Sequence, residues 1–291
     1  MTQRGLFPSW LDGSLARDAS FGRAYAAVPD ARRALLKTAI ARLWDWCAPA
    51  EALHRRAETL WRSGLRSVSL AEPRRFAMML FDAGETSPSR LLAALVPALA
   101  AGVPDVLAVR LGGRALPPAP QLLALELAGV ERLALLSRAR CAELLAHLGQ
   151  GGESGAVLAL GREAASVVAE ARLHSARQRA WTPGSGPAGV WLERGAGSDL
   201  EALDFAQQGA EIHVWGAGRR SIPGGFVRRS GTFETFLRQG YSALYVPEAR
   251  REACAGRAPL VLGPGCESCW LWPDLEASLF TPRRVCWSVD G

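Results

Sequence analysis

The stretch that decides the fold begins with Phe76-Ala-Met-Met-Leu-Phe81 and continues through a polar turn into Ser89–Ala101, whose apolar residues recur at helical spacing. Gly102 ends this helical pattern, and a second short apolar run, Val106–Val109, follows it. Continuous apolar runs of this length are typical of parallel strands that helices cover on both faces. The stretch therefore predicts a strand–helix–strand unit with both strands in one sheet.

The same alternation continues along the chain. Helix-compatible segments span Gln121–Ala128, Arg140–Leu148 and Arg162–His174, and apolar runs lie at Arg132–Leu136 and Ala156–Leu160. We predict an α/β protein with a doubly wound, mostly parallel sheet in which the apolar runs are neighbouring strands. Shorter strands are predicted at Val190–Leu192, Glu211–Trp215, Ala243–Val246 and Pro259–Leu262, and shorter helices at Asp199–Gln208 and Thr232–Arg238.

Three regions are expected from these patterns. Ala31–Cys47 has the apolar stripe of an amphipathic helix, and Ala50–Trp61 is predicted as a second helix that stops at a glycine. Residues 1–72 therefore form a helical N-terminal segment, which packs on the sheet or on a second copy of the chain in a homodimer. Residues 73–246 form the α/β domain, and residues 247–291 form a segment rich in cysteine and tryptophan.

The composition is that of an ordinary globular protein. Of 291 residues, 49% are hydrophobic and 21% are charged, and the formal net charge is +6. The positive charge is nearly all arginine, since Lys37 is the only lysine, and asparagine is absent, which fits a GC-rich genome. Because the arginines are scattered without an aromatic-studded basic patch, we expect no nucleic-acid partner.

Sequence features also bear on location. The chain has no apolar stretch of about 20 residues that would span a bilayer. The first residues, Met1–Trp10, lack the apolar core of a signal peptide. Six cysteines in a chain of this length do not make a disulfide scaffold. We therefore predict a cytoplasmic protein with no membrane partner.

The segment Thr86-Ser-Pro-Ser-Arg-Leu-Leu-Ala-Ala-Leu-Val-Pro-Ala-Leu-Ala-Ala-Gly-Val-Pro-Asp-Val106 resembles a segment of bacterial histidinol dehydrogenases. In that family, this segment opens the cofactor-binding domain. Leu127-Ala-Gly-Val-Glu-Arg-Leu133 resembles the family's next junction between helix and strand. The resemblance implies an aldehyde dehydrogenase-like fold and a nicotinamide cofactor, NAD(P).

A second segment of resemblance, Ser185–Glu211, concerns metal binding. The family's helix here ends in Gln-Ala-Glu-His, whose Gln and His bind the catalytic zinc. In this chain Gln208 matches the Gln ligand, and Glu211 stands in the position of the His. Glutamate can also ligate zinc, so the resemblance implies a zinc site at these two residues. The alternative is that both are solvated residues at the end of a helix.

The third segment, Gly225–Gln239, resembles a part near the end of the family's catalytic domain. Between the second and third segments the family carries a long stretch with the Glu-His pair that moves protons. This chain has only the short loop 213–224 there. Because hydride transfer from an alcohol needs a base, we predict no oxidation of histidinol.

The expected cofactor site lies where the strands end. The family's phosphate-binding turn, Gly-Pro-Gly-Asn, is replaced by Ala159-Leu-Gly-Arg162. Backbone N–H groups at the start of the following helix could hold an anion there, helped by Arg162. The resemblance thus implies cofactor binding near Ser87, Ser89, Gly161 and Arg162. A plain turn between strand and helix is the alternative.

The cysteines near the end of the chain are an independent signal. Cys266-Glu-Ser-Cys269 has the spacing at which two thiolates reach one metal ion. Together with Cys254 and Cys286 it predicts a zinc or iron–sulfur site. Two alternatives stay open: the cysteines are buried free thiols, or Cys266 and Cys269 are a redox pair.

Three functions follow from these observations. The first is a nicotinamide-dependent oxidoreductase with a remodelled active site. The second is a non-catalytic descendant of the same family that binds a nucleotide or a partner protein. The third, which depends on the cysteines alone, is a metal-binding or electron-transfer module. The missing Glu-His segment favours the second function over the first.

Overall fold

The structure, a computed structural model, describes residues 6–48, 53–171, 173, 177–195, 198–216 and 221–289. In this part of the chain, strands form two parallel sheets of five strands each and one antiparallel sheet of three. The first parallel sheet has the order β5-β4-β3-β6-β7. Its strands are β3 (Phe76–Phe81), β4 (Asp105–Leu111), β5 (Leu133–Leu136), β6 (Gly155–Leu160) and β7 (Gln178–Trp181).

The first sheet confirms the predicted doubly wound arrangement. The four predicted strands are parallel neighbours, and β3 lies between β4 and β6 with Phe76 opposite both Asp105 and Gly155. Successive side chains of β3 point to opposite faces. Met79 packs in the core on one face and Met78 in the core on the other. Both faces are covered, which explains why the strand is continuously apolar.

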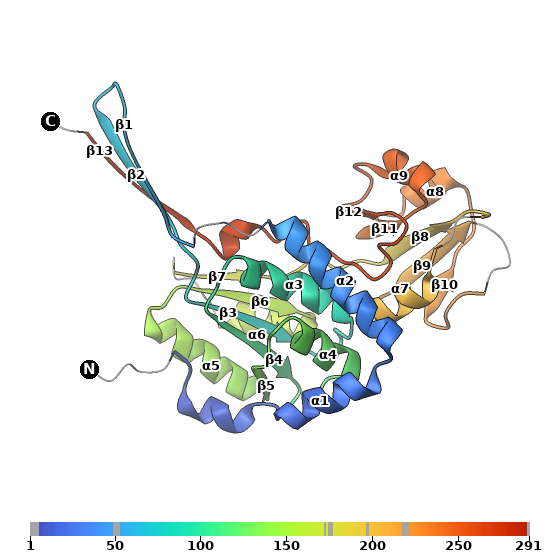
Figure 1. Cartoon of the computed structure of the whole chain (residues 1–291), viewed down its shortest axis with the longest axis horizontal. Helices are drawn as coiled ribbons and strands as arrows, with labels where there is room; N and C mark the ends of the chain where they lie inside the picture. Colours follow the sequence, from blue (N-terminus) through green and yellow to red (C-terminus); the bar gives the residue numbers. More distant parts are fainter. Residues whose placement is uncertain are drawn as a thin grey trace.

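Helices cover the two faces of this sheet in separate layers (Figure 1). One face carries α3 and α4 with α1 and α2 outside them, and the other carries α5 and α6. The positions predicted for α2 to α6 are confirmed to within a few residues, and α1 was not predicted from the sequence. Residue 174, the predicted end of the last of these helices, lies outside the described residues. The helices are α1 (Asp18–Ala27), α2 (Asp30–Cys47), α3 (Pro88–Ala100), α4 (Ala119–Leu127), α5 (Arg138–Gly151) and α6 (Arg162–Glu170). Among the described residues, no helix combines the length and apolar character that a bilayer crossing requires.

The second parallel sheet follows in the chain and has the order β10-β9-β8-β11-β12. Its last strand falls in the segment 247–291, so the sheet crosses the boundary expected at residue 246. Its strands are β8 (Ala188–Leu192), β9 (Ile212–Gly216), β10 (Phe226–Arg228), β11 (Ala243–Tyr245) and β12 (Leu260–Leu262). Its helices are α7 (Leu200–Ala206), α8 (Phe233–Leu237) and α9 (Glu248–Cys254).

The antiparallel sheet forms an arm that projects from the body of the molecule (Figure 1). It consists of β1 (Arg55–Leu60), β2 (Leu65–Ala71) and β13 (Arg283–Val289), with β2 in the middle. The helix predicted over Ala50–Trp61 is therefore wrong, because its described residues contain the strand β1. Residues 49–52 lie outside the part of the chain that the structure describes. Gly64, with φ +81°, closes a hairpin between β1 and β2 instead of ending a helix.

Candidate functional site

The order of the strands in the first sheet reverses between β3 and β6, and we call the carboxyl ends of these two strands the crevice of this sheet. In open α/β sheets, ligands bind outside the carboxyl ends of the strands at such a point. Asp82 directly follows β3, and Gly161 directly follows β6 and begins α6. The two residues predicted for the cofactor turn, Gly161 and Arg162, therefore do lie at the crevice.

Asp82 occupies the N-terminus of α6. Its Oδ2 accepts hydrogen bonds from the backbone N–H groups of Glu163, at 2.7 Å, and Ala164, at 3.2 Å. Its Oδ1 accepts a third from the N–H of Gly84, at 2.8 Å, and the side chain is buried. The first N–H groups of a helix have no partner within the helix and carry its positive partial charge. An internal carboxylate thus satisfies the groups that were expected to hold a phosphate.

Gly161 and Arg162 form the turn between β6 and α6 at which Asp82 lies. Gly161 has φ +98°, a conformation that favours glycine, and its missing side chain leaves room for the carboxylate of Asp82. The side chain of Arg162 is exposed to solvent. Asp82 was not among the residues singled out in the sequence. A polar residue after a buried strand looks like any turn residue, and its partners lie about eighty positions further along.

Ser87 and Ser89 join the first sheet's domain to the second. The hydroxyl of Ser87 accepts from the N–H of Arg90 at 3.1 Å as the N-cap of α3, and it donates to the carbonyl of Ala206 at 2.7 Å. The hydroxyl of Ser89 donates to the carbonyl of Ser268 at 2.7 Å. Both serines are buried. Their hydroxyls are therefore engaged in contacts between the two domains.

Arg90 fills the space between these domains. Its Nε donates to Oε1 of Gln207 at 3.2 Å, and its guanidinium lies 4.4 Å from the centre of the Trp270 ring. Burial lowers the pKa of Arg90, and the nearby Glu85 partly offsets this. Burial likewise raises the pKa of Glu85, with Arg90 opposing the shift. The sequence offered no signal for this cluster beyond the polar turn that precedes α3.

The two residues implied as zinc ligands are not brought into a ligand set. The backbone carbonyl of Gln208 accepts from the hydroxyl of Thr86 at 2.7 Å. The exposed Glu211 carboxylate contacts Nε2 of His213 at 2.8 Å, and Nδ1 of His213 lies 3.1 Å from the Tyr241 hydroxyl. Within the described residues, no three His, Cys, Asp or Glu side chains come together as a metal site.

The four cysteines divide between separate places. Cys266 and Cys269 are close together, because Nη1 of Arg42 lies 3.7 Å from the first sulfur and 3.3 Å from the second. Cys254 is buried in the aromatic core of the second sheet, and Cys286 is exposed on β13 of the arm. A site shared by all four is therefore not formed, because their elements belong to different parts of the fold. All six cysteines are free thiols.

Comparison with known proteins identifies the fold. No protein-family model matches the chain, and no curated protein matches it in sequence. Among solved structures, it is similar to histidinol dehydrogenase from Elizabethkingia anophelis, with 12% identity, a TM-score of 0.61, and coverage of 95% of this chain and 77% of that one.

Two further structures are similar. An aldehyde dehydrogenase from Bacillus cereus has 10% identity and a TM-score of 0.51, covering 94% of this chain and 82% of that one. Succinate-semialdehyde dehydrogenase from Burkholderia pseudomallei has 12% identity and a TM-score of 0.50, covering 93% and 84%. The chain therefore has an aldehyde dehydrogenase-like fold, and its structural neighbours are dehydrogenases. At these identities the similarity concerns the fold alone.

Proposed function

We propose that this chain is a non-catalytic protein with a dehydrogenase-like fold, which acts by binding and not by hydride transfer. The observation that carries the proposal is the carboxylate of Asp82 at the N-terminus of α6. A phosphate placed there would lose the N–H groups that Asp82 already uses and would be repelled by its charge. The crevice is therefore closed to the pyrophosphate of a nicotinamide dinucleotide.

Two other observations support the same proposal. The chain lacks the segment that, by its resemblance to histidinol dehydrogenases, would carry the proton-transferring Glu-His pair. The hydroxyls of Ser87 and Ser89 are taken by contacts between the domains. The alternative, an NAD(P)-dependent oxidoreductase with a remodelled active site, has only the fold in its favour.

The arm supports a homodimer as the partner. Its strands β1 and β13 are exposed along their whole length, and the exposed fractions are 65% for Leu60 and 70% for both Trp287 and Val289. Apolar side chains exposed together on a projecting sheet mark an interaction surface. We propose that a second copy of the chain covers them.

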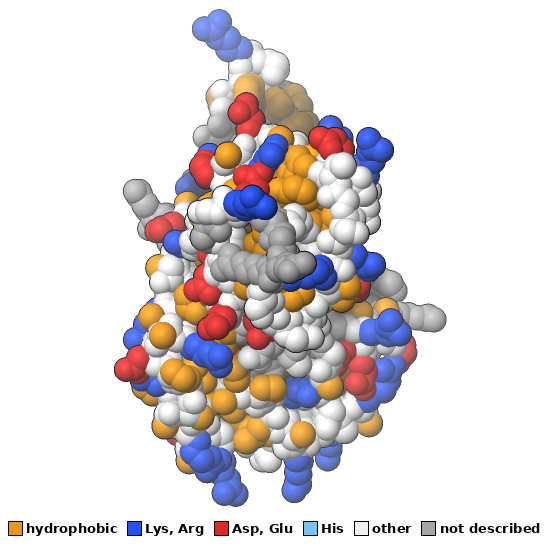
Figure 2. Space-filling view, turned by 90° about the vertical axis from the view of Figure 1, so that its right-hand side faces the viewer, with side chains coloured by type: hydrophobic (Ala, Val, Ile, Leu, Met, Phe, Trp, Pro, Cys, Tyr) orange, Lys and Arg blue, Asp and Glu red, His pale blue; other side chains and the backbone are white. Residues whose placement is uncertain are grey.

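Two general features of the proposed protein follow. On the side that carries the second sheet, basic and acidic side chains are interspersed (Figure 2), so that side lacks the continuous basic surface that favours nucleic acid. Six free thiols are consistent with a reducing compartment, and we propose the cytoplasm.

Calorimetric titration of the purified chain with NAD⁺ and NADP⁺ tests the main proposal. We expect no binding at the crevice, and no NADH formation from histidinol. Binding that Arg162→Ala weakens, together with steady NADH formation, would overturn the proposal. The same titration of Asp82→Asn shows whether the carboxylate charge is what excludes the dinucleotide.

A further inference from the structure

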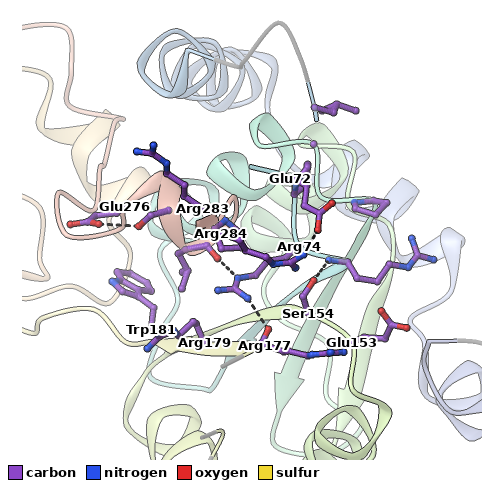
Figure 3. A pocket seen from close by; sticks show the side chains of 18 of the residues that line it. Glu72, Arg74, Glu153, Ser154, Arg177, Arg179, Trp181, Glu276, Arg283 and Arg284 are labelled. Carbon is purple, nitrogen blue, oxygen red and sulfur yellow. Dashed lines mark hydrogen bonds and ion pairs between the residues drawn. The ribbon is translucent and has the colours of Figure 1, made fainter. Parts of the chain in front are cut away.

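A cavity of about 1400 Å³ lies at the opposite edge of the first sheet, where its strands begin (Figure 3). Its walls come mainly from the residues just before β3 and β6, from β7, and from the start of β13 with the segment that leads into it. Small-molecule sites usually measure roughly 300–1,000 Å³, so a metabolite fits inside it. The cavity is separate from the crevice that Asp82 closes.

Guanidinium groups dominate this cavity. Six arginines line it, against four carboxylates. Arg284 is paired with Glu72 at 2.6 Å, and Arg75 is paired with Asp105 at 3.1 Å. Among the described residues, the other four arginines have no carboxylate within ion-pair distance; they are Arg74, Arg177, Arg179 and Arg283.

Arg74 is the arginine of this set that most strongly indicates a bound anion. Only 3% of its surface is exposed, and its partners are two neutral carbonyls, of Leu279 at 2.5 Å from Nε and of Arg177 at 2.7 Å from Nη1. Burial lowers its pKa, and the neighbouring cations Arg179 and Arg284 lower it further. A buried charge without a counter-charge is costly. An anion in the cavity would remove that cost.

The neighbouring side chains extend the site. Figure 3 shows Arg74 beside Arg284, with Arg179 and Trp181 together on one side of them. The indole N–H of Trp181 is buried and has no hydrogen-bond partner among the described residues. Trp181 therefore contributes an apolar ring to the lining, and the polar donors of the cavity are its guanidinium groups.

We propose that this cavity binds a small organic or inorganic anion with two or more phosphate groups, held by Arg74, Arg179 and Arg284. Guanidinium groups suit phosphate because they can donate two parallel hydrogen bonds. Several cations around one cavity fit a multivalent ligand better than a single phosphate.

Calorimetric titration of the full chain with sodium tripolyphosphate tests the proposal, with inorganic phosphate and sodium citrate as comparisons, at about 0.1 M salt. Tripolyphosphate should bind more tightly than either comparison. Arg179→Gln should weaken its binding about tenfold or more, since a charge-assisted contact is lost. Arg179 is exposed and has no ion pair in the described structure, so this variant should fold.

Arg162→Gln is the matched control, because it removes an exposed arginine at the other edge of the same sheet. It should leave tripolyphosphate binding unchanged. The proposal is overturned if tripolyphosphate does not bind, if Arg162→Gln weakens binding as much as Arg179→Gln, or if citrate binds more tightly. Tighter binding of a short DNA duplex, lost in Arg179→Gln, would also overturn it in favour of a nucleic-acid surface.

Discussion

The carboxylate of Asp82 fills the space that a side chain on Gly161 would need. A Cβ atom on Gly161 would lie 2.3 Å from Oδ1 and 2.4 Å from Oδ2 of Asp82, well inside van der Waals contact. The two residues follow neighbouring parallel strands, so their pairing closes the crevice where the sheet's order reverses. Both Asp82 and Gly161 are needed to close the crevice, and a substitution at each residue tests its part separately.

Gly161→Ala should destabilise the fold by about 1–3 kcal/mol, because it adds a clash to a positive-φ backbone. Urea denaturation measures the loss. Gly149→Ala is the control: Gly149 lies in α5 with nothing within 4 Å of an added Cβ, so alanine should be neutral or stabilising there. Equal stability of Gly161→Ala and the unaltered chain would contradict the packing of Asp82 against this turn.

Asp82→Ala should lower the free energy of unfolding by about 1–3 kcal/mol, because three backbone N–H groups lose their acceptor. Asp82→Asn keeps one acceptor oxygen and should lose less. The comparison by urea denaturation separates hydrogen bonding from charge. If alanine and asparagine are both harmless, the carboxylate does not cap α6.

Glu85 predicts a pH dependence of stability. Burial raises its pKa, and Arg90 opposes the shift. The folded state therefore holds the carboxyl proton of Glu85 more tightly than the unfolded state does. The contribution of this group to the free energy of unfolding is thus fully present at low pH. It is lost as the pH rises from the ordinary carboxyl pKa, about 4.3, through the raised folded value. Compared with the unaltered chain, Glu85→Gln should gain relative stability over that window, measured by urea denaturation at several pH values. A constant difference between the two proteins would refute this.

Trp287→Ser combined with Val289→Ser should convert the proposed homodimer into monomers, because both residues belong to the exposed arm. Light scattering coupled to gel filtration measures the mass. Trp46→Ser is the matched control, since Trp46 is also exposed, at 68%, but lies on α2. A monomeric unaltered chain, or a dimer that survives the arm substitutions, would refute the proposal.

The first sheet could be predicted from the sequence because its signals are local. β3 is buried on both faces and reads as a continuous apolar run, and glycines such as Gly102 mark where its helices stop. The arm could not be predicted in this way. β1 is exposed along its whole length, so no apolar pattern marks it as a strand, and its neighbour β2 pairs with β13 from far along the chain.

The candidate site, too, could be predicted from the sequence only where its features are local. Gly161 and Arg162 were placed correctly at a turn between strand and helix, because the strand and helix are locally encoded. The acceptor that fills the turn after β6 is Asp82, which follows β3, and the cation that defines the cavity is Arg74, which precedes β3. Both act through contacts between distant segments. Only the order and register of the strands reveal them.

The antiparallel arm has a consequence for biosynthesis. The strands of the first sheet are made close together in time, so that sheet can assemble while the chain is still emerging from the ribosome. β13 is synthesised only after the whole second sheet, and until then β2 is paired with β1 alone. Leu279, which accepts the hydrogen bond from Arg74, also arrives late. A nascent chain halted before residue 275 would carry a finished sheet, an incomplete arm and an open anion cavity.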